Sequence, residues 1–193
     1  MVKIGITGGI GSGKSVVAEL LRNMGYPVFD TDREAKLLME KSDLIRSKLT
    51  ALFGPQTYEG RCLNRAYLAS HIFTDENARL QVNAIVHPEV RRYFFAWCES
   101  QDAPVVFFES AILYESDFHQ AADRIWVVIA PDEVRIERTV SRDKTTPKQV
   151  RARMDSQLSQ AEKEARADYI IHNDGKEALI PQVLVGLEKI RDI

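Results

Sequence analysis

A run of nine residues near the start of the chain has the types and spacing of a phosphate-binding loop. Residues 7–15 read Thr-Gly-Gly-Ile-Gly-Ser-Gly-Lys-Ser, so Gly8, Gly13, Lys14 and Ser15 fit the P-loop pattern G-x-x-x-x-G-K-[ST]. Glycines let several backbone N–H groups turn inward around an anion, and the helix that follows adds its positive end. Lys14 would contact the β- and γ-phosphates, and the Ser15 hydroxyl would be a ligand of Mg²⁺. The pattern indicates binding of a nucleoside triphosphate.

The flanking sequence favours this interpretation over a chance match. Residues 2–7 are typical of a short buried strand that ends at the first glycine. Apolar residues then recur at the spacing of a helix that lies on a sheet, at Val16, Val17, Leu20, Leu21 and Met24. Gly25 and Pro27 end that helix. Strand, loop and helix in this order are the context that the motif requires.

The composition is that of a globular protein with a real core. The 193 residues are 45% hydrophobic and 28% charged, which suits one α/β domain with a small inserted lobe. A net charge of −2 without a long basic run gives no support to a nucleic-acid partner. Cys62 and Cys98 lack the spacing of metal ligands, so we expect reduced thiols and no zinc site. No run approaches the ~18 apolar residues that cross a bilayer, so we expect a cytoplasmic protein without a membrane partner.

Two carboxylates follow the predicted second strand, residues 27–29. Asp30 and Asp32 would lie at the carboxyl end of that strand, where ligands bind in doubly wound sheets. They could hold a metal ion, orient a substrate hydroxyl or accept its proton. Alternatively, one of them caps the helix predicted over residues 33–41, because Asp is a favoured N-cap residue. The two interpretations are compatible, and the sequence leaves both open.

Residues from about 42 to 102 predict an all-helical insertion between the second and third strands. Helical stripes are expected near residues 44–52, 65–72 and 75–97, and Pro88 must kink or divide the longest of them. His87 could be a helix cap, a hydrogen-bonding core residue or a substrate contact. We favour a structural role, because the following proline already imposes a special backbone. Such a lobe is well placed to cover an acceptor substrate.

The predicted third strand, residues 104–108, also ends in a carboxylate. Glu109 would lie near the phosphate-binding loop if the two strands are neighbours, where it could hold a Mg²⁺-bound water or the acceptor. The competing interpretation is a buried, paired carboxylate with no part in chemistry. Residues 110–115 would line the entrance to the pocket.

The helix predicted after the fourth strand, residues 125–130, is rich in arginine. Arg138 and Arg142 are four residues apart, hence on one face and able to converge on one anionic group, although a plain surface helix also carries arginines. A basic segment with little apolar content follows, and residues 146–149 resemble a capping box that starts another helix. A hinged lid over ATP needs these features, since closure would bring guanidinium groups onto the phosphoryl group and exclude water.

A fifth strand over residues 169–171 leads into the loop of Asn173 and Gly175, which could hold adenine through backbone groups or be a bare turn. The whole chain therefore predicts an α/β fold: a five-stranded parallel sheet flanked by helices, with a helical acceptor-binding insertion and an arginine-rich lid. We expect one domain, residues 1–193. Its core covers about 1–41, 103–143 and 167–193, its acceptor lobe about 42–102 and its lid about 143–166.

The sequence lacks the Asn-Lys-x-Asp and Asp-x-x-Gly motifs of a switch GTPase, and a motor or transporter ATPase would be larger, so a small-molecule kinase remains. The details resemble the dephospho-coenzyme A kinase family over nearly the whole chain. The matching motifs are the P-loop of residues 7–15, Asp30-Thr31-Asp32, His87-Pro88, Leu113-Tyr114-Glu115, Arg138-Thr139 with Arg142-Asp143, and Asn173-Asp174-Gly175.

The resemblance implies a P-loop kinase fold and transfer of the γ-phosphoryl group of ATP to the ribose 3′-hydroxyl of dephospho-coenzyme A, with Mg²⁺. Asp32 would be the general base, with Asp30 supporting it or the substrate. Lys14 and Arg142 would stabilise the γ-phosphoryl group, and Ser15 would hold Mg²⁺. The other implied ATP contacts are Gly9, Gly11, Ser12, Gly13, Val16, Arg138, Asn173 and Gly175. The other implied substrate contacts are Thr7, Gly8, His87 and Glu109.

The chain departs from the family pattern at two places. Val16 replaces a usual Thr, which removes one possible phosphate contact, and Glu109 with Ala111 replaces a usual Asp and Pro. The alternatives are a nucleoside monophosphate kinase or other small-metabolite kinase of the same fold, and a nucleotide-binding regulatory module without transfer activity. We expect a monomer or small homo-oligomer.

Overall fold

The structure is a computed structural model that describes residues 1–73 and 75–191. Its contacts divide the chain into two compact units. Met1–Asp30 and Gln101–Ile193 form the first, here called the sheet unit, and Thr31–Ser100 form the second, the helical unit. The helical unit begins at Thr31, whereas the sequence analysis placed residues 31–41 with the sheet core. The difference arises because the helix of these residues packs against the longest helix of the helical unit.

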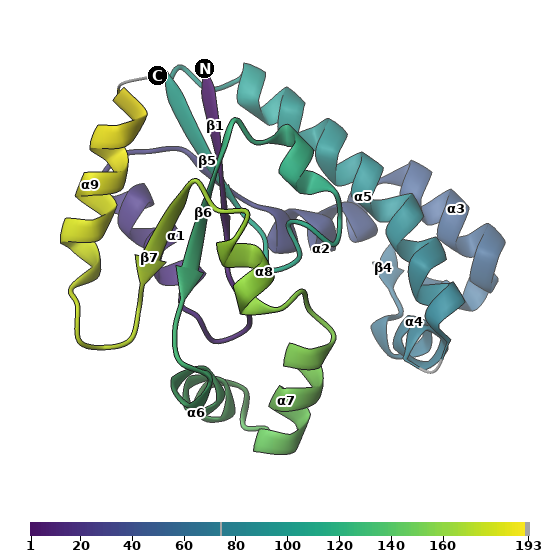
Figure 1. Ribbon diagram of the computed structural model, residues 1–193. Coiled ribbons are helices and arrows are strands. Elements are labelled where there is room, and N and C mark those ends of the chain that lie inside the picture. Colours follow the sequence, from purple (N-terminus) through teal and green to yellow (C-terminus); the bar gives the residue numbers. More distant parts are fainter. Residues whose placement is uncertain (74, 192–193) are drawn as a thin grey trace. The chain divides into compact units, whose positions relative to one another are not determined.

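Five parallel strands form the centre of the sheet unit in the order β2-β5-β1-β6-β7 (Figure 1). The strands are β1 (Val2–Thr7), β2 (Val28–Asp30), β5 (Val105–Glu109), β6 (Arg124–Ile129) and β7 (Tyr169–His172). Their apolar, β-branched and aromatic residues suit a parallel sheet, which is buried on both faces. The prediction of a five-stranded parallel sheet is confirmed.

The helices of the sheet unit pack around this sheet or follow its strands. They are α1 (Lys14–Asn23), α6 (Asp132–Asp143), α7 (Pro147–Asp155), α8 (Gln160–Glu164) and α9 (Leu179–Arg191), with a short 3₁₀ helix at Phe118–Ala121. Helices α1 and α9 contact each other, and both lie against the sheet. Their buried faces meet the strands in a core of Ile4, Ile6, Val17, Leu21, Phe107, Trp126, Val128, Ile171, Val183, Leu187 and Ile190. Helix α7 begins with the predicted capping box, in which Thr146 and Gln149 bond to each other's backbone.

The helical unit consists of helices packed around α5 (Glu76–Glu99), which contacts α2 (Thr31–Lys41), α3 (Asp43–Phe53) and α4 (Arg65–Ile72). The expectation of an all-helical insertion is wrong in one place. A 3₁₀ turn at Pro55–Thr57 leads into an antiparallel hairpin of β3 (Tyr58–Glu59) and β4 (Cys62–Leu63). Two-residue strands are too short to show an alternating pattern in the sequence. Gly60, with φ of 60°, lies in the turn between them. Pro88 lies inside α5 and does not divide it.

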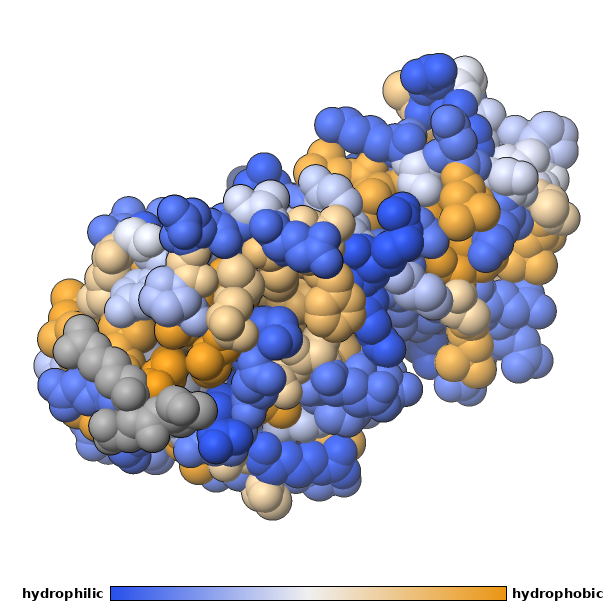
Figure 2. All heavy atoms as spheres, turned by 90° about the horizontal axis from the view of Figure 1, so that it is seen from above, coloured by the Kyte–Doolittle hydropathy of each residue, from blue (hydrophilic) through white to orange (hydrophobic). Residues whose placement is uncertain are grey.

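Hydrophilic side chains are interspersed with smaller hydrophobic areas over the face drawn in Figure 2. A membrane-spanning helix would need a longer apolar stretch than any helix of residues 1–73 and 75–191 provides.

Candidate active site

The predicted phosphate-binding loop joins β1 to α1 and has the backbone that its glycines were expected to provide. Gly11 and Gly13 have φ of 77° and 92°, in the left-handed region that favours glycine. Side chains at these positions would also collide with neighbours: a Cβ at Gly11 would lie 2.7 Å from Thr139 Oγ1, and one at Gly13 would meet Asn173 Nδ2. The loop is therefore packed closely between β1 and the segments around it, with no space for side chains at either glycine.

Two buried hydroxyl groups of this loop have no hydrogen-bond partner among residues 1–73 and 75–191. The Ser12 and Thr7 hydroxyls are buried and make no hydrogen bond to any described residue. Lys14 and Ser15 are the first residues of α1, so their backbone N–H groups have no intrahelical acceptors. Val16 follows them and is exposed, with its N–H bonded to the Gly13 carbonyl. Because unpaired buried polar groups are costly, this arrangement fits a loop shaped to hold a polar anionic ligand.

Two of the predicted carboxylates lie side by side at the carboxyl edge of the sheet. Strand β5 pairs with both β1 and β2, and Glu109 is in register with Ile6 on one side and Asp30 on the other. The condition for Glu109 to lie near the phosphate-binding loop, that β1 and β5 are neighbours, is therefore met. Thr7 and Gly8 follow Ile6 directly and share this edge.

Glu109 is 4% exposed and forms an ion pair with Arg22 of α1, whose Nη2 lies 3.3 Å from Glu109 Oε1. Burial raises the pKa of this carboxyl, and the charge of Asp30 raises it further. A hydrogen bond from Ser15 and the charges of Lys14 and Arg22 act in the opposite direction. Glu109 is thus buried and paired, and it lies beside the P-loop residues, while its role in the chemistry remains a prediction.

Asp32 and His87 belong to the helical unit. Helix α2 begins at Thr31, two residues earlier than expected, so Asp30 directly precedes it and Asp32 is exposed in its first turn. A carboxylate in this turn interacts favourably with the helix dipole. His87 is half-buried in α5, which packs against α2. The catalytic and substrate roles of these two residues remain predictions.

Arg138 and Asn173 lie against the phosphate-binding loop, as their expected contact with a nucleotide requires. Arg138 donates from Nη1 to the Asn173 carbonyl at 3.0 Å and from Nη2 to Asn173 Oδ1 at 3.4 Å. Asn173 Nδ2 in turn donates to the Ser12 carbonyl at 2.8 Å. Gly175 lies two residues further on, with φ of 83°. One chain of hydrogen bonds therefore runs from α6 through the loop after β7 to the P-loop.

Arg142 lies at the exposed end of α6. Its Nε donates to Asp143 Oδ1 at 2.7 Å, and its Nη2 donates to Asp143 Oδ2 at 3.2 Å. Arg153 of α7 donates to the same Oδ2 at 2.8 Å. Hydrogen bonds from both arginines hold the pKa of Asp143 far below its usual range. Arg138 and Arg142 therefore have separate partners in the structure, and their convergence on one anionic group remains a prediction.

The structure also brings together charged and polar residues to which the sequence analysis gave no role. Arg135 is 5% exposed, and its Nε donates to the Ile10 carbonyl of the P-loop at 3.0 Å. Gln157, between α7 and α8, accepts from the Ile10 N–H at 2.9 Å. Lys163 of α8 is 1% exposed and pairs with Glu115. The sequence held no signal for them, because each stands in a polar, charged stretch that is typical of a surface helix.

Comparison with known proteins identifies the family. The family model described as dephospho-CoA kinase matches residues 2–178. The chain belongs to the dephospho-CoA kinase family. It is 45% identical to the dephospho-CoA kinase of Bacteroides fragilis over 184 residues, which cover 95% of this chain and 90% of the relative. It is 42% identical to that of Porphyromonas gingivalis over 192 residues, 99% of this chain and 95% of the relative.

A solved structure from Thermus thermophilus has the same fold. It superposes with a TM-score of 0.84 and is 35% identical, covering 99% of this chain and 96% of the other. The P-loop kinase fold is thus shown, with its parallel sheet and flanking helices, and kinases of this family act on a nucleotide substrate.

The oxygen atoms around Ser15 suit a magnesium ion that arrives with a nucleotide. The nearby protein donors are the Ser15 hydroxyl and the Glu109 carboxylate, which are hard oxygen ligands. Among residues 1–73 and 75–191, no group of three or more His, Cys, Asp or Glu side chains could hold a metal by itself. Magnesium usually keeps several waters and takes phosphate oxygens as ligands, so one or two protein donors are sufficient.

Proposed function

We propose that this member of the dephospho-CoA kinase family transfers the γ-phosphoryl group of ATP to the ribose 3′-hydroxyl of dephospho-CoA. The products are CoA and ADP, and the reaction is the last step of CoA biosynthesis. The observation that carries the proposal is the match of residues 2–178 to the family. The glycine loop supports it, because its buried, unpartnered hydroxyls and the start of α1 suit a polyphosphate.

In the proposed reaction, the loop and α1 bind the phosphates of ATP. Lys14 contacts the β- and γ-phosphates, while the backbone of Gly9, Gly11, Ser12, Gly13 and Val16 lines the cradle. Arg138, Asn173 and Gly175 contact the nucleotide beside Ser12, which suits the hydrogen bonds that join Arg138, Asn173 and the Ser12 carbonyl. Ser15 and Glu109 would hold Mg²⁺, which neutralises phosphate charge when it is bound.

Asp32 accepts the proton of the ribose 3′-hydroxyl as its oxygen attacks the γ-phosphorus. The bond between that phosphorus and the bridging oxygen of ADP breaks, and the electron pair leaves with ADP. Arg142 stabilises the negative charge of the phosphoryl group in transfer. Thr7, Gly8, Asp30, His87 and Glu109 contact the acceptor.

In this proposal the helical unit is the acceptor-binding lobe. Residues of about 143–166 are the lid. Arg142 is well suited to a mobile lid, because its side chain is 63% exposed and pairs with the adjacent residue Asp143. We place the reaction in the cytosol, where ATP is available.

The test is an acceptor panel with purified protein, ATP and Mg²⁺. Dephospho-CoA should be converted to CoA with matching release of ADP, while nucleoside monophosphates and small hydroxy acids should not react. Preferential phosphorylation of another acceptor would replace the proposal with a different kinase activity. Binding of ATP without any acceptor-dependent release of ADP would instead indicate a regulatory module.

A further inference from the structure

The backbone N–H and C=O of Ile10, which belong to two successive peptide groups of the P-loop, both bond to side chains from outside the loop. Its carbonyl accepts a hydrogen bond from Arg135 Nε of α6 at 3.0 Å. Its N–H donates to Gln157 Oε1 at 2.9 Å, across 147 residues of sequence. Ile10 itself is buried, at 8% exposure. The two side chains flank α7 in the sequence: Arg135 precedes the predicted lid, and Gln157 lies within it, after α7.

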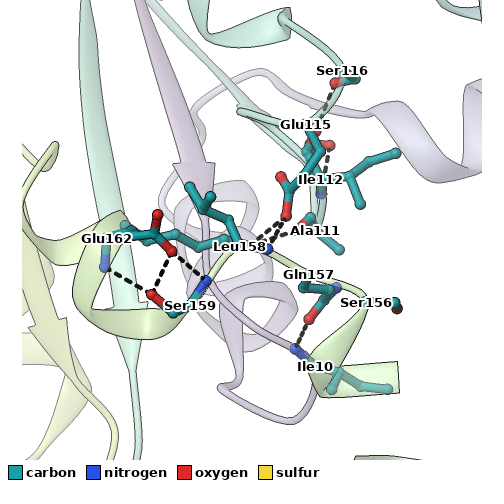
Figure 3. A network of polar contacts seen from close by, with 12 residues as sticks. Ile10, Ala111, Ile112, Glu115, Ser116, Ser156, Gln157, Leu158, Ser159 and Glu162 are labelled. Atoms are coloured by element: carbon teal, nitrogen blue, oxygen red, sulfur yellow. Dashed lines mark hydrogen bonds and ion pairs between the residues drawn. The ribbon is translucent and has the colours of Figure 1, made fainter. Parts of the chain in front are cut away.

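Gln157 is itself held in place by its own segment. We call residues 156–163 the lid root, because this stretch connects α7 to α8, which contacts β6 of the sheet. The backbone N–H of Leu158, the residue after Gln157, donates to Glu115 Oε1 at 2.8 Å. The N–H of Gln157 donates to the Met154 carbonyl at the end of α7. Figure 3 shows Gln157 directed at Ile10 and Glu115 directed at Leu158.

A buried ion pair fixes the other end of the lid root. Lys163 Nζ lies 3.2 Å from Glu115 Oε1 and donates to the Ala111 carbonyl at 3.1 Å. Ala111 is two residues after Glu109, so the lid root is bonded both to the P-loop and to the loop that follows β5. Ser159 and Glu162 complete the segment with a capping box that starts α8.

We propose that Gln157 is a positioning residue for nucleotide binding. By accepting from the Ile10 N–H, it fixes the orientation of the Gly9–Ile10 peptide group, and so preserves the shape of the phosphate cradle before a nucleotide arrives. The inference rests on the proposed function only in that the P-loop binds a nucleotide. Gln157 acts through the backbone of the loop, since its acceptor atom is already bonded to Ile10. The lid root is thereby a fixed support of the cradle, and lid motion is confined to α7.

A preformed cradle lowers the cost of ordering the loop when phosphate binds. Losing one hydrogen bond that maintains this order should weaken binding by about three- to tenfold, the range expected for a single neutral bond. The effect should be equal for ADP and ATP, because both place phosphates in the same loop. The Michaelis constant for the acceptor should not change.

The experiment compares ADP binding by calorimetry in the wild type, Gln157→Met and Gln160→Met, without any acceptor present. Gln157→Met keeps the length of the side chain and removes the acceptor of the Ile10 N–H. Gln160→Met is the matched control in the same region, because Gln160 Oε1 accepts from the Ala130 N–H, which is outside the P-loop. We expect the dissociation constant of ADP to rise about three- to tenfold in Gln157→Met only.

Unchanged ADP affinity in Gln157→Met, or an equal loss in Gln160→Met, would overturn the inference. If Gln157→Met does not fold, amide hydrogen exchange of the wild-type protein tests the proposal instead. The Ile10 N–H should exchange slowly with solvent both with and without ADP. Fast exchange of this N–H in the protein without ADP would contradict the proposal. These ADP-binding results do not depend on the acceptor, so they would stand even if dephospho-CoA were not the acceptor. A wild-type protein that does not bind ADP would refute the proposed function.

Discussion

The ion pair between Lys163 and Glu115 offers a sharp test of how the lid root is stabilised. Lys163 is 1% exposed and Glu115 is 24% exposed, with 3.2 Å between Nζ and Oε1. Glu115→Gln keeps the shape of the side chain and an oxygen that can accept from the Leu158 N–H. It removes the negative charge, so the Lys163 ammonium stays buried beside a neutral amide.

The expected loss is large for a single conservative substitution. Removing one partner of a buried ion pair costs about 3–5 kcal/mol, because the other charge is left without compensation. Glu115 is partly exposed, and Lys163 retains its bond to the Ala111 carbonyl, so we expect the lower end, about 3 kcal/mol. For a chain of this size that loss lowers the unfolding temperature by about 6–12 °C. Lys163→Met should cost less, because it removes the buried charge and leaves Glu115 with water and the Leu158 N–H.

The pH dependence provides a second, independent readout. Burial lowers the pKa of Lys163 below its ordinary value of 10.5, and Glu115 opposes this shift. The unfolded chain therefore binds this proton more tightly than the folded chain, so the free energy of unfolding rises with pH between the lowered pKa and 10.5. Without Glu115 the pKa of Lys163 falls further, and the rise begins at lower pH. The difference in the free energy of unfolding between the wild type and Glu115→Gln should therefore become smaller as the pH is raised.

Urea unfolding of the wild type, Glu115→Gln, Lys163→Met and Glu19→Gln at several alkaline pH values measures these differences. Glu19→Gln is the matched control, because Glu19 is 62% exposed and its pair with Arg22 should contribute about 0–1 kcal/mol. The reasoning fails if Glu115→Gln is as stable as Glu19→Gln. It also fails if the deficit of Glu115→Gln grows with pH.

Three substitutions test the proposed site directly. Asp32→Asn should lower kcat by about 10²- to 10⁴-fold with ATP binding unchanged, and equal turnover would exclude Asp32 as the general base. Arg142→Met should lower kcat by about 10²- to 10³-fold with little change in ADP binding. An equally large loss of ADP affinity would instead show that Arg142 acts by binding the nucleotide in the ground state. Gly13→Ala should strongly weaken ADP binding in calorimetry, because its φ of 92° costs about 1–3 kcal/mol for alanine and the new Cβ has no space. Gly54→Ala is its control, with φ of 90° but nothing within 4 Å of the new Cβ, and should leave ADP affinity unchanged.

Local patterns made much of the protein predictable. The spacing of Gly8, Gly13, Lys14 and Ser15 identified the phosphate-binding loop, because the backbone shape of such a loop depends on a few adjacent residues. All five strands of the sheet were expected within about one residue of their observed ends, since each is an apolar run bounded by turn residues. The hairpin at Gly60 was missed because its strands have only two residues each.

The sequence by itself thus determined the five strands of the sheet and the position of the P-loop motif between the first strand and its helix. Tertiary structure alone decided that β5 lies between β1 and β2, which puts Glu109 in register with both Ile6 and Asp30. It also decided that Arg135, Gln157 and Lys163 support the P-loop and its neighbouring loop, although they resemble surface residues in the sequence. Burial depends on what packs over a residue from distant parts of the chain, and no local pattern of charges carries that information.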